Sequence, residues 1–348
     1  MERYIFIIAQ DGDITCDEVC HWLQRMGSIN ILRLNDTDHI SLVDISIRNG
    51  NRSGFKICVN SDLIINSQCI VAYWYRRGGM AYVPVKMKDT FNKNPGAIQL
   101  TENVNEYYNK EWEHITDYLH SLLLNSGIKN LGSFFDLKCN KLINLEIAKS
   151  CGLLIPDTII SNDVAEIENF LKSYNKVITK PVRNPASRYD IAETRVTYSQ
   201  QTNLFTLADL IESSGRPYQP TQFQEYIEKD FEVRSFYLDG RFFSMAIFSQ
   251  SSEQTQIDFR NYNQETPNRN VPFRLPEEIE QCLDQLMKGL NYKTGSIDLI
   301  YNGEQYYFLE VNTVGQLKWL SRNCNYYVEK EIADYILTDL EQSILTVK

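Results

Sequence analysis

Two predicted strands near the C-terminal end, 295–301 and 305–312, carry a set of oxygen-bearing side chains. Asp298 lies on the first strand, and Glu310 and Asn312 share one face of the second, because strand side chains alternate with period two. Carboxylate and amide oxygens suit one or two Mg²⁺ ions that bridge nucleotide phosphates. The alternative is a plain hairpin with its polar residues in solvent, but ionised carboxylates among apolar neighbours are costly without a cation.

The register of this hairpin decides whether the three side chains meet. If Asn302-Gly303 formed a simple two-residue turn, Asp298 would pair with Tyr307 and face away from Glu310. We therefore predict a loop with an odd number of residues, or a bulge at Gly303, that shifts the register by one. Either device brings Asp298 to the face of Glu310.

A second group of polar residues lies in the segment 223–234. An extended run followed by an acid and an arginine would let the backbone near 225–227 contact adenine edges. In the same arrangement, Glu232 would hold ribose hydroxyls and Arg234 would face phosphate oxygens. The pattern is weak when it is taken alone.

Further charged residues lie on other predicted elements. Lys180 ends a buried strand, where its ammonium either faces a phosphate or extends to the surface. Lys141 lies early in a predicted helix, where a solvated helix face is the default. Asp258 and Arg260 share a face of an extended segment, so Asp258 either orients Arg260, accepts the proton of an attacking group, or forms a plain ion pair.

The elements that must position these residues follow from hydrophobic periodicity. In the first third, strand and helix patterns alternate, as in an open α/β sheet. The expected elements are strands at 4–8, 29–34, 40–47, 55–59 and 69–76, a helix that ends at Gly27, and a long helix over 103–124. A small α+β part follows, with helices at 136–150 and 163–174 and strands at 153–160 and 176–180. The rest is mostly β, with a hairpin turn predicted at Asp239-Gly240.

We therefore predict an α/β and α+β chain in three parts. These parts are an N-terminal α/β domain (1–128), a central lobe (129–216) and a C-terminal lobe (217–348) that carries the metal-binding candidates. A chain of 348 residues is long enough for two or three such parts.

Composition excludes several classes of function. Lys plus Arg number 35 against 45 Asp plus Glu, and the net charge of −10 opposes binding to nucleic acid or to an acidic membrane. The eight cysteines form no CxxC pair, so neither a zinc cage nor a disulfide framework is indicated. Since no stretch of 18 apolar residues occurs, we expect a soluble, cytoplasmic protein.

In this order and spacing, the clusters resemble those of the ATP-grasp superfamily of carboxylate–amine or carboxylate–alcohol ligases. Within it, three segments look like the graspetide (microviridin-type) ligases, in particular the ATP-grasp maturases of grasp-with-spasm peptide systems. These segments are Trp74-Tyr75-Arg76-Arg77, the run from Ile247 to Arg260, and Glu310-Val-Asn-Thr-Val-Gly-Gln316. The resemblance covers most of the chain and implies an ATP-grasp fold with an N-terminal α/β domain and two lobes that clamp ATP.

The resemblance also implies ATP and Mg²⁺ as cofactors and a role for each candidate. The implied roles are phosphate binding for Lys141 and Lys180, the adenine hinge for Glu225, Tyr226, Ile227 and Glu228, the ribose contact for Glu232, neutralisation of phosphate or acyl phosphate for Arg234 and Arg260, and metal binding for Asp298, Glu310 and Asn312. Asp258 is the accompanying catalytic candidate.

One departure concerns the loop over the phosphates. Many ATP-grasp enzymes have a glycine-rich loop there, but this chain has no glycine between Gly152 and Gly215. The stretch 181–195 either closes over ATP by another backbone route or serves partly as a peptide-binding hairpin, as it looks to do in graspetide ligases. In such a hairpin, Asp190 and Glu193 either contact a basic leader peptide or lie in solvent.

The leading hypothesis is an ATP-dependent macrocyclase that joins Asp or Glu side chains of a precursor peptide, with leader and core, to Thr, Ser or Lys side chains through an acyl phosphate. Arg76 and Arg77 either contact an acidic core peptide or form a structural pair. The alternatives are an ATP-grasp ligase for a small molecule or a protein C-terminus, and a non-catalytic nucleotide- or peptide-binding protein. Ester or amide linkage and a homodimeric state stay open.

Overall fold

The computed structural model describes residues 2–27, 29–82, 95–183, 186–191, 194–199, 201–213, 219–251, 253–261, 264–265, 267–338 and 340. Its internal contacts divide the chain into two units, Met1–Leu137 with Tyr327–Lys348, and Lys138–Tyr326. Within the described ranges, no helix combines the length and the apolar composition needed to cross a bilayer.

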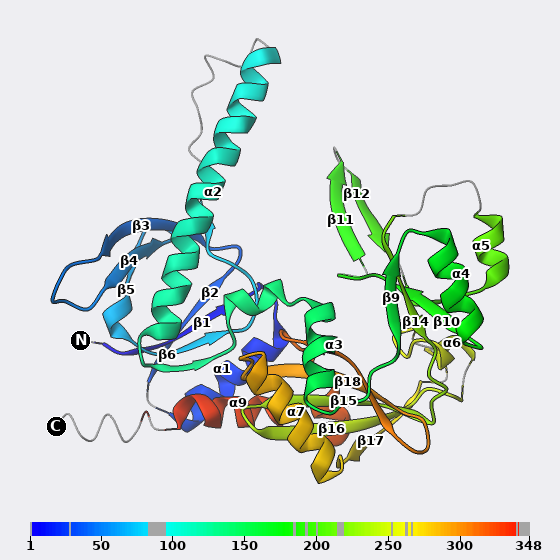
Figure 1. The fold of residues 1–348 in the computed structure, drawn as a ribbon. Helices are drawn as coiled ribbons and strands as arrows, with labels where there is room; N and C mark the ends of the chain where they lie inside the picture. Colours follow the sequence, from blue (N-terminus) through cyan, green and yellow to red (C-terminus); the bar gives the residue numbers. More distant parts are fainter. Residues whose placement is uncertain are drawn as a thin grey trace. The chain divides into compact units, whose positions relative to one another are not determined.

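The first unit contains a parallel sheet in the order β2-β1-β6-β8 (Figure 1). Its strands are β1 (Tyr4–Ala9), β2 (Asn30–Asn35), β6 (Ile70–Tyr75) and β8 (Lys129–Leu131). Helix α1 (Ile14–Met26) begins at Asp13, whose carboxylate accepts a hydrogen bond from the backbone of Cys16 at 3.0 Å. Helix α9 (Val328–Leu337) packs on α1. The last described helix therefore belongs with this unit, although the sequence assigned all of 217–348 to one lobe.

A second sheet in the first unit has the order β5-β4-β3-β7, made of β3 (His39–Ser46), β4 (Gly54–Val59), β5 (Leu63–Asn66) and β7 (Ala81–Tyr82). The sequence placed 40–47 and 55–59 in one open sheet with the other strands, and this was wrong. Strands β3, β4 and β5 instead pair antiparallel with their neighbours in the chain. Their buried side chains, such as Phe55 and Ile57, share a core with Tyr73 of the parallel sheet and Leu119 of helix α2 (Pro95–Asn125).

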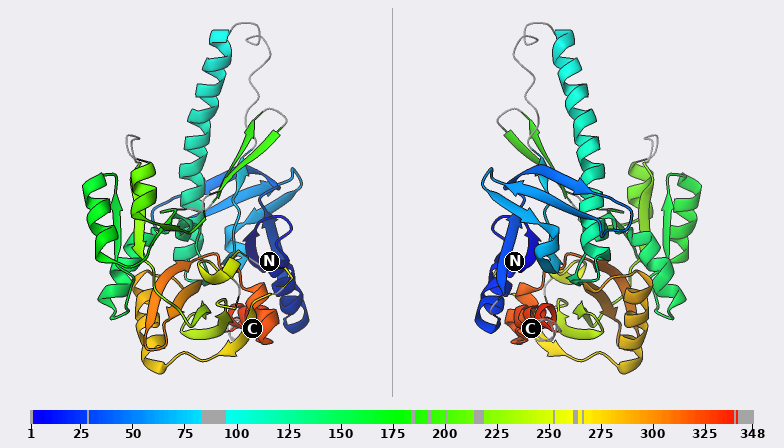
Figure 2. Two further views of the ribbon diagram at one scale, coloured as in Figure 1. Left: turned by 90° about the vertical axis from the view of Figure 1, so that its right-hand side faces the viewer. Right: turned by 90° about the vertical axis from the view of Figure 1, so that its left-hand side faces the viewer.

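In the second unit, one antiparallel sheet has the order β13-β10-β14-β9, with β9 (Thr158–Ser161), β10 (Val177–Lys180), β13 (Asn203–Phe205) and β14 (Thr221–Glu225). Strand β9 is shorter than the predicted 153–160, because Pro156 has no N–H for a sheet ladder. Helices α4 (Val164–Ser173) and α5 (Leu207–Glu212) lie together on this sheet, around a core that includes Ile167 and Phe223 (Figure 2).

The second unit also contains the antiparallel pair β11 (Ala186–Ile191) and β12 (Thr194–Ser199), which lies partly within the predicted hairpin segment 181–195. The predicted helix 136–150 is divided into a 3₁₀ turn, η3 (Phe134–Lys138), and helix α3 (Lys141–Ser150). The Asn140 side chain caps α3 by accepting the Leu142 N–H at 3.0 Å, so Lys141 is the first helical residue.

The second sheet of this unit has the order β17-β16-β15-β18-β19. Its strands are β15 (Phe231–Leu238), β16 (Arg241–Phe248), β17 (Arg269–Phe273), β18 (Thr294–Tyr301) and β19 (Tyr306–Asn312), accompanied by α6 (Glu253–Gln256), α7 (Glu277–Gly289) and α8 (Lys318–Cys324). The two-residue turn at Asp239-Gly240 is confirmed, because Leu238 pairs with Arg241 and both turn residues have positive φ angles. Side chains of β15, β18, β19 and α7 form the core.

Candidate active site

The β18–β19 hairpin brings the two acidic candidates face to face. Asp298 pairs directly with Glu310 in the antiparallel register, so the predicted shared face is confirmed. The structural feature that aligns the two residues differs from the predicted one. The loop between Tyr301 and Tyr306 has four residues, and the register shifts by one at Leu309, which lies between the residues paired with Asp298 and Leu299.

The four-residue loop alone would place Asp298 opposite Leu309, so the bulge and not the loop aligns Asp298 with Glu310. The Asn302 side chain accepts the backbone N–H groups of Glu304 and Gln305 at 3.0 and 2.8 Å, which closes a wider turn than Asn302-Gly303 alone would make. A bulge deeper in the strand then supplies the odd residue. The predicted bulge at Gly303 was therefore wrong in place, although the orientation it was to produce is present.

Four further contacts converge on the paired carboxylates. Arg234 pairs with Asp298 in the β15–β18 register, and its Nε lies 2.9 Å from Asp298 Oδ1. Lys141 Nζ lies 2.6 Å from Glu310 Oε2. The Asn312 amide nitrogen bridges the two acids, 3.4 Å from Asp298 Oδ2 and 3.2 Å from Glu310 Oε1. Lys141 is thus turned to the acidic pair and not to a solvated helix face.

The charges around the two acids give them different proton affinities. Burial, assisted by the Glu310 charge, raises the pKa of Asp298 to about 6 although Arg234 opposes the shift. Burial also favours the neutral form of Glu310, but the ammonium groups of Lys141 and Lys180 outweigh it and lower the pKa of Glu310 to about 2. At neutral pH, the two carboxylates therefore lie side by side in a buried place, next to the positive charges of Arg234 and Lys141.

A cavity in the same unit adjoins the acidic pair. Of the candidates, nine line it: Lys180, Glu225, Tyr226, Ile227, Glu232, Asp258, Arg260, Asp298 and Glu310. Its apolar lining includes Ile178, Val233 and Leu299. Lys180 lies three residues along β10 from Val177, the partner of Glu225, and the charges of Glu310 and Arg260 lie near it, so the charged end of the cavity lies away from the 225–227 segment. Such a cavity suits a ligand with a flat apolar ring at one end and a polyanion at the other.

Lys180 lies at the charged end of this cavity. Burial lowers its pKa, and the nearby charges of Lys141 and Arg260 act in the same direction, whereas Glu310 opposes them. A buried ammonium is costly unless it is paired, so an anion bound in the cavity would stabilise the charged form of Lys180. The geometry therefore favours the anion-facing interpretation over the surface lysine.

Asp258 and Arg260 form a two-pronged ion pair beside the cavity. Arg260 Nε lies 2.8 Å from Asp258 Oδ1, and its second nitrogen lies 2.6 Å from Oδ2. The Arg260 and Thr202 contacts outweigh burial and lower the pKa of Asp258. A weakly basic carboxylate is a poor proton acceptor, so the geometry favours the orienting ion pair over the general base.

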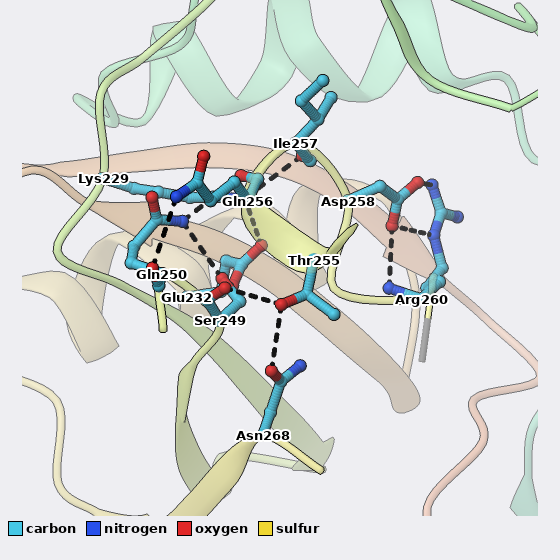
Figure 3. A network of polar contacts seen from close by, with 10 residues as sticks. All are labelled: Lys229, Glu232, Ser249, Gln250, Thr255, Gln256, Ile257, Asp258, Arg260 and Asn268. Carbon is cyan, nitrogen blue, oxygen red and sulfur yellow. Dashed lines mark hydrogen bonds and ion pairs between the residues drawn. The ribbon is translucent and has the colours of Figure 1, made fainter. Parts of the chain in front are cut away.

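Glu232 is buried, and both of its oxygens are in use (Figure 3). Lys229 donates to Oε1, and the Ser249 hydroxyl donates to Oε2. Burial raises the pKa of Glu232 against these donors. Lys229 was not among the predicted site residues, and the signal that could have found it is a lysine three residues before an acid in a segment where charged and apolar residues alternate.

Two aromatic side chains that were not among the predicted site residues lie beside Arg234. The Arg234 guanidinium carbon lies 5.8 Å from the ring centre of Phe259 and 5.7 Å from that of Trp319. Rings at this distance favour a cation and keep water from it. They therefore hold Arg234 beside Asp298.

The remaining candidates lie elsewhere. In the first unit, Arg76 is 5% exposed, and it and Arg77 pair with Asp13 Oδ2 at 3.3 and 2.9 Å, the arrangement of a structural pair. Glu228 pairs with Lys176 in solvent and does not line the cavity. Asp190 lies opposite Arg195 in the β11–β12 hairpin. Glu193 lies outside the described residues.

The family described as "Prokaryotic glutathione synthetase, ATP-grasp domain" matches residues 140–297. No curated protein matches the sequence. An RiPP-associated ATP-grasp ligase of Chryseobacterium gregarium, in complex with ADP and a leader and core peptide, is 23% identical, with a TM-score of 0.74 over 98% of this chain and 97% of that one.

Two macrocyclases of Microcystis aeruginosa are also similar. One, bound with its precursor peptide, is 25% identical, with a TM-score of 0.71 over 96% of this chain and 99% of its own. The other is 21% identical, with a TM-score of 0.66 over 97% of this chain and 99% of its own. The chain therefore has the ATP-grasp fold, and over nearly its whole length it is similar to ATP-grasp ligases and macrocyclases of precursor peptides.

Proposed function

We propose that the protein is an ATP-dependent, ADP-forming ligase that makes side-chain ester or amide crosslinks in a ribosomally made precursor peptide. The observation that carries the proposal is a single cavity that joins an apolar end at Tyr226 and Ile227 to a charged end at Lys180, Arg260 and Glu310. The similarity over nearly the whole chain to a ligase in complex with ADP and a leader and core peptide supports it.

ATP fits the cavity in one direction. The hinge residues Glu225, Tyr226 and Ile227 contact the adenine, with Glu228 next to them, and Glu232 faces the ribose. The phosphates lie at the charged end, where Lys180 lines the cavity and Lys141 is near it.

The acidic pair suits Mg²⁺. Asp298 Oδ1 is buried beside Arg234 Nε at 2.9 Å in an ion pair without hydrogen-bond geometry, and Glu310 and Asn312 bring further oxygens to the same point. Rotation of the Asn312 amide by half a turn replaces its N–H by an oxygen there. Within the described residues, no group of three His, Cys, Asp or Glu forms a metal site, so the donor set is two carboxylates and one amide. Mg²⁺ bound there would neutralise phosphate charge.

The reaction follows from positioning and charge. A substrate carboxylate attacks the γ-phosphorus of ATP, ADP leaves, and a substrate hydroxyl or amine then displaces phosphate from the acyl phosphate. Arg234 and Arg260 stabilise the negative charge that develops, and Asp258 orients Arg260. No protein nucleophile takes part.

The peptide partner binds at two places in this proposal. The β11–β12 hairpin, with Asp190 and Glu193, contacts the leader, and the core reaches the cavity. Arg76 and Arg77 share the single carboxylate of Asp13, so their two positive charges are only half compensated by it. The positive charge of the pair would attract acidic residues of the core peptide. ATP and a ribosomal peptide are both made inside the cell, so we place the reaction in the cytoplasm.

The match to a glutathione synthetase domain supports a second candidate, a carboxylate–amine ligase for a small molecule or a protein C-terminus. Short open reading frames beside the gene that encode repeated Thr and Asp or Glu would provide the peptide to test. We expect ADP release that depends on this peptide and the loss of one water per crosslink in its mass. ADP release with glutamate or a dipeptide, and none with the peptide, would favour the second candidate. Nucleotide binding without turnover of either substrate class would favour a non-catalytic protein.

A further inference from the structure

A buried lysine beside the cavity has no role in the proposed reaction. Lys229 is 8% exposed and lines the cavity. Its ammonium donates to the Glu232 carboxylate and, at 3.2 Å, to the carbonyl oxygen of Ile257. A buried ammonium is costly unless it is paired and hydrogen-bonded, and the protein supplies both kinds of partner here. Its charge is therefore matched within the fold.

The second partner of Lys229, the Ile257 carbonyl, lies directly before Asp258 and Arg260 in the chain. Ile257 is followed by Asp258, whose two oxygens hold the Arg260 side chain at 2.8 and 2.6 Å (Figure 3). Asp258 also accepts the Arg260 backbone N–H at 3.0 Å. The pair is thus internally rigid, and its place beside the cavity depends on where the backbone at Ile257 is held.

Other contacts hold the beginning of the same loop to the same acid. The Ser249 hydroxyl donates to Glu232, and the buried Thr255 hydroxyl lies 2.6 Å from the Ser249 carbonyl oxygen. Gln250 Nε2 lies 3.2 Å from the Gln256 carbonyl oxygen (Figure 3). Glu232 therefore holds the beginning of the loop through Ser249. Lys229 binds both Glu232 and the Ile257 carbonyl, and so connects the same acid to the end of the loop next to Arg260.

We propose that Lys229 is a positioning residue that sets the place of Arg260 by tying the Ile257 carbonyl to Glu232. This inference rests on the proposed function for the part of Arg260 in the reaction. Catalysis by positioned charge is sensitive to small displacements, and a shift of about 1 Å costs on the order of 100-fold in rate. A long neutral side chain at position 229 would keep the volume and lose both contacts.

The test is a double-mutant cycle on peptide-dependent ADP release. We expect Lys229→Met to lower kcat on the order of 100-fold with little change in KM for ATP, because the lost interaction acts on transition-state charge. Arg260→Ala should lower kcat by about 10²–10³-fold. If Lys229 acts through Arg260, the double variant loses no more than Arg260→Ala alone, whereas independent roles would multiply to at least about 10⁴-fold.

Folding is controlled with two further variants. Because Lys229→Met leaves Glu232 buried without its partner, the cycle is repeated with Lys229→Met/Glu232→Gln in place of Lys229→Met, which removes the unpaired charge. Lys172→Met is the matched control, since Lys172 forms an exposed ion pair with Glu168 at 2.6 Å. It should change neither kcat nor the melting temperature.

Hydrogen–deuterium exchange of the amides at 257–260 gives a readout that needs no turnover. Faster exchange there in Lys229→Met than in Lys172→Met, together with the non-additive cycle, supports the proposal. Unchanged exchange, or an additive cycle, overturns it. A wild-type protein that releases no peptide-dependent ADP would refute the proposed function, and the exchange measurement would still decide whether Lys229 anchors the loop.

Discussion

Replacing Lys141 with Met should remove the charge that keeps Glu310 ionised. The two side chains meet at 2.6 Å, and their exposed fractions are 23% and 12%. The pKa of Glu310 is lowered from 4.5 to about 2 in the folded protein. Since each pKa unit corresponds to about 1.4 kcal/mol, the ionised Glu310 contributes about 3 kcal/mol to the free energy of unfolding. Lys180 and Arg260 share in this shift, so about 3 kcal/mol is an upper bound for Lys141 alone.

The sign follows from the direction of the pKa. A carboxyl whose folded pKa is lowered stabilises the protein fully above 4.5, and this stabilisation is lost as the pH falls toward 2. In urea unfolding without Mg²⁺ or nucleotide, Lys141→Met should therefore lower the unfolding free energy by about 1–3 kcal/mol at pH 7. The difference from the wild type should shrink below pH 4.5. Lys172→Met, which breaks an exposed pair, should cost less than about 1 kcal/mol.

Two results would refute this reasoning. One is a Lys141→Met variant as stable as Lys172→Met at pH 7. The other is a loss of stability that is the same at pH 7 and pH 4, which would mean that packing of the lysine stem and not the charge of Glu310 is responsible.

Three other predictions are direct. Lys180→Ala should lower peptide-dependent ADP release by about 10²–10³-fold while circular dichroism stays unchanged, and normal turnover would remove Lys180 from the site. Reversing the charges of Asp190 and Glu193 should weaken leader affinity in calorimetry and leave Mg-ATP affinity near the wild-type value; the opposite pattern would assign the hairpin to the phosphates. Burial raises the pKa of Asp136 from 3.8 to about 7, so its neutral form is favoured and its destabilising effect grows as the pH rises from 4 to 7. Asp136→Asn should therefore raise the melting temperature at pH 8 and not at pH 4, and equal shifts at both would contradict the argument.

The sequence by itself determined most elements and the types of residue at the site. Hydrophobic periodicity found β1, α1, α4 and β10, because it reports directly which face of an element is buried. The Asp239-Gly240 turn was found because the positive φ angles of a two-residue hairpin favour these residue types. The carboxylates and cations could also be named in advance, since polar residues in apolar strands require partners.

The tertiary structure decided which of these residues meet. Lys141 and Glu310 are 169 positions apart, and no local pattern relates a residue at a helix start to one on a distant strand. Leu309 is an ordinary apolar strand residue that no local pattern marks as a bulge, and without the bulge Asp298 would pair with Leu309 and face away from Glu310. The same holds for Lys229, because an ammonium can bind any nearby oxygen and only the path of the chain brings the Ile257 carbonyl to it. Periodicity records burial, whereas pairing between distant segments is set by how the packed elements fit together.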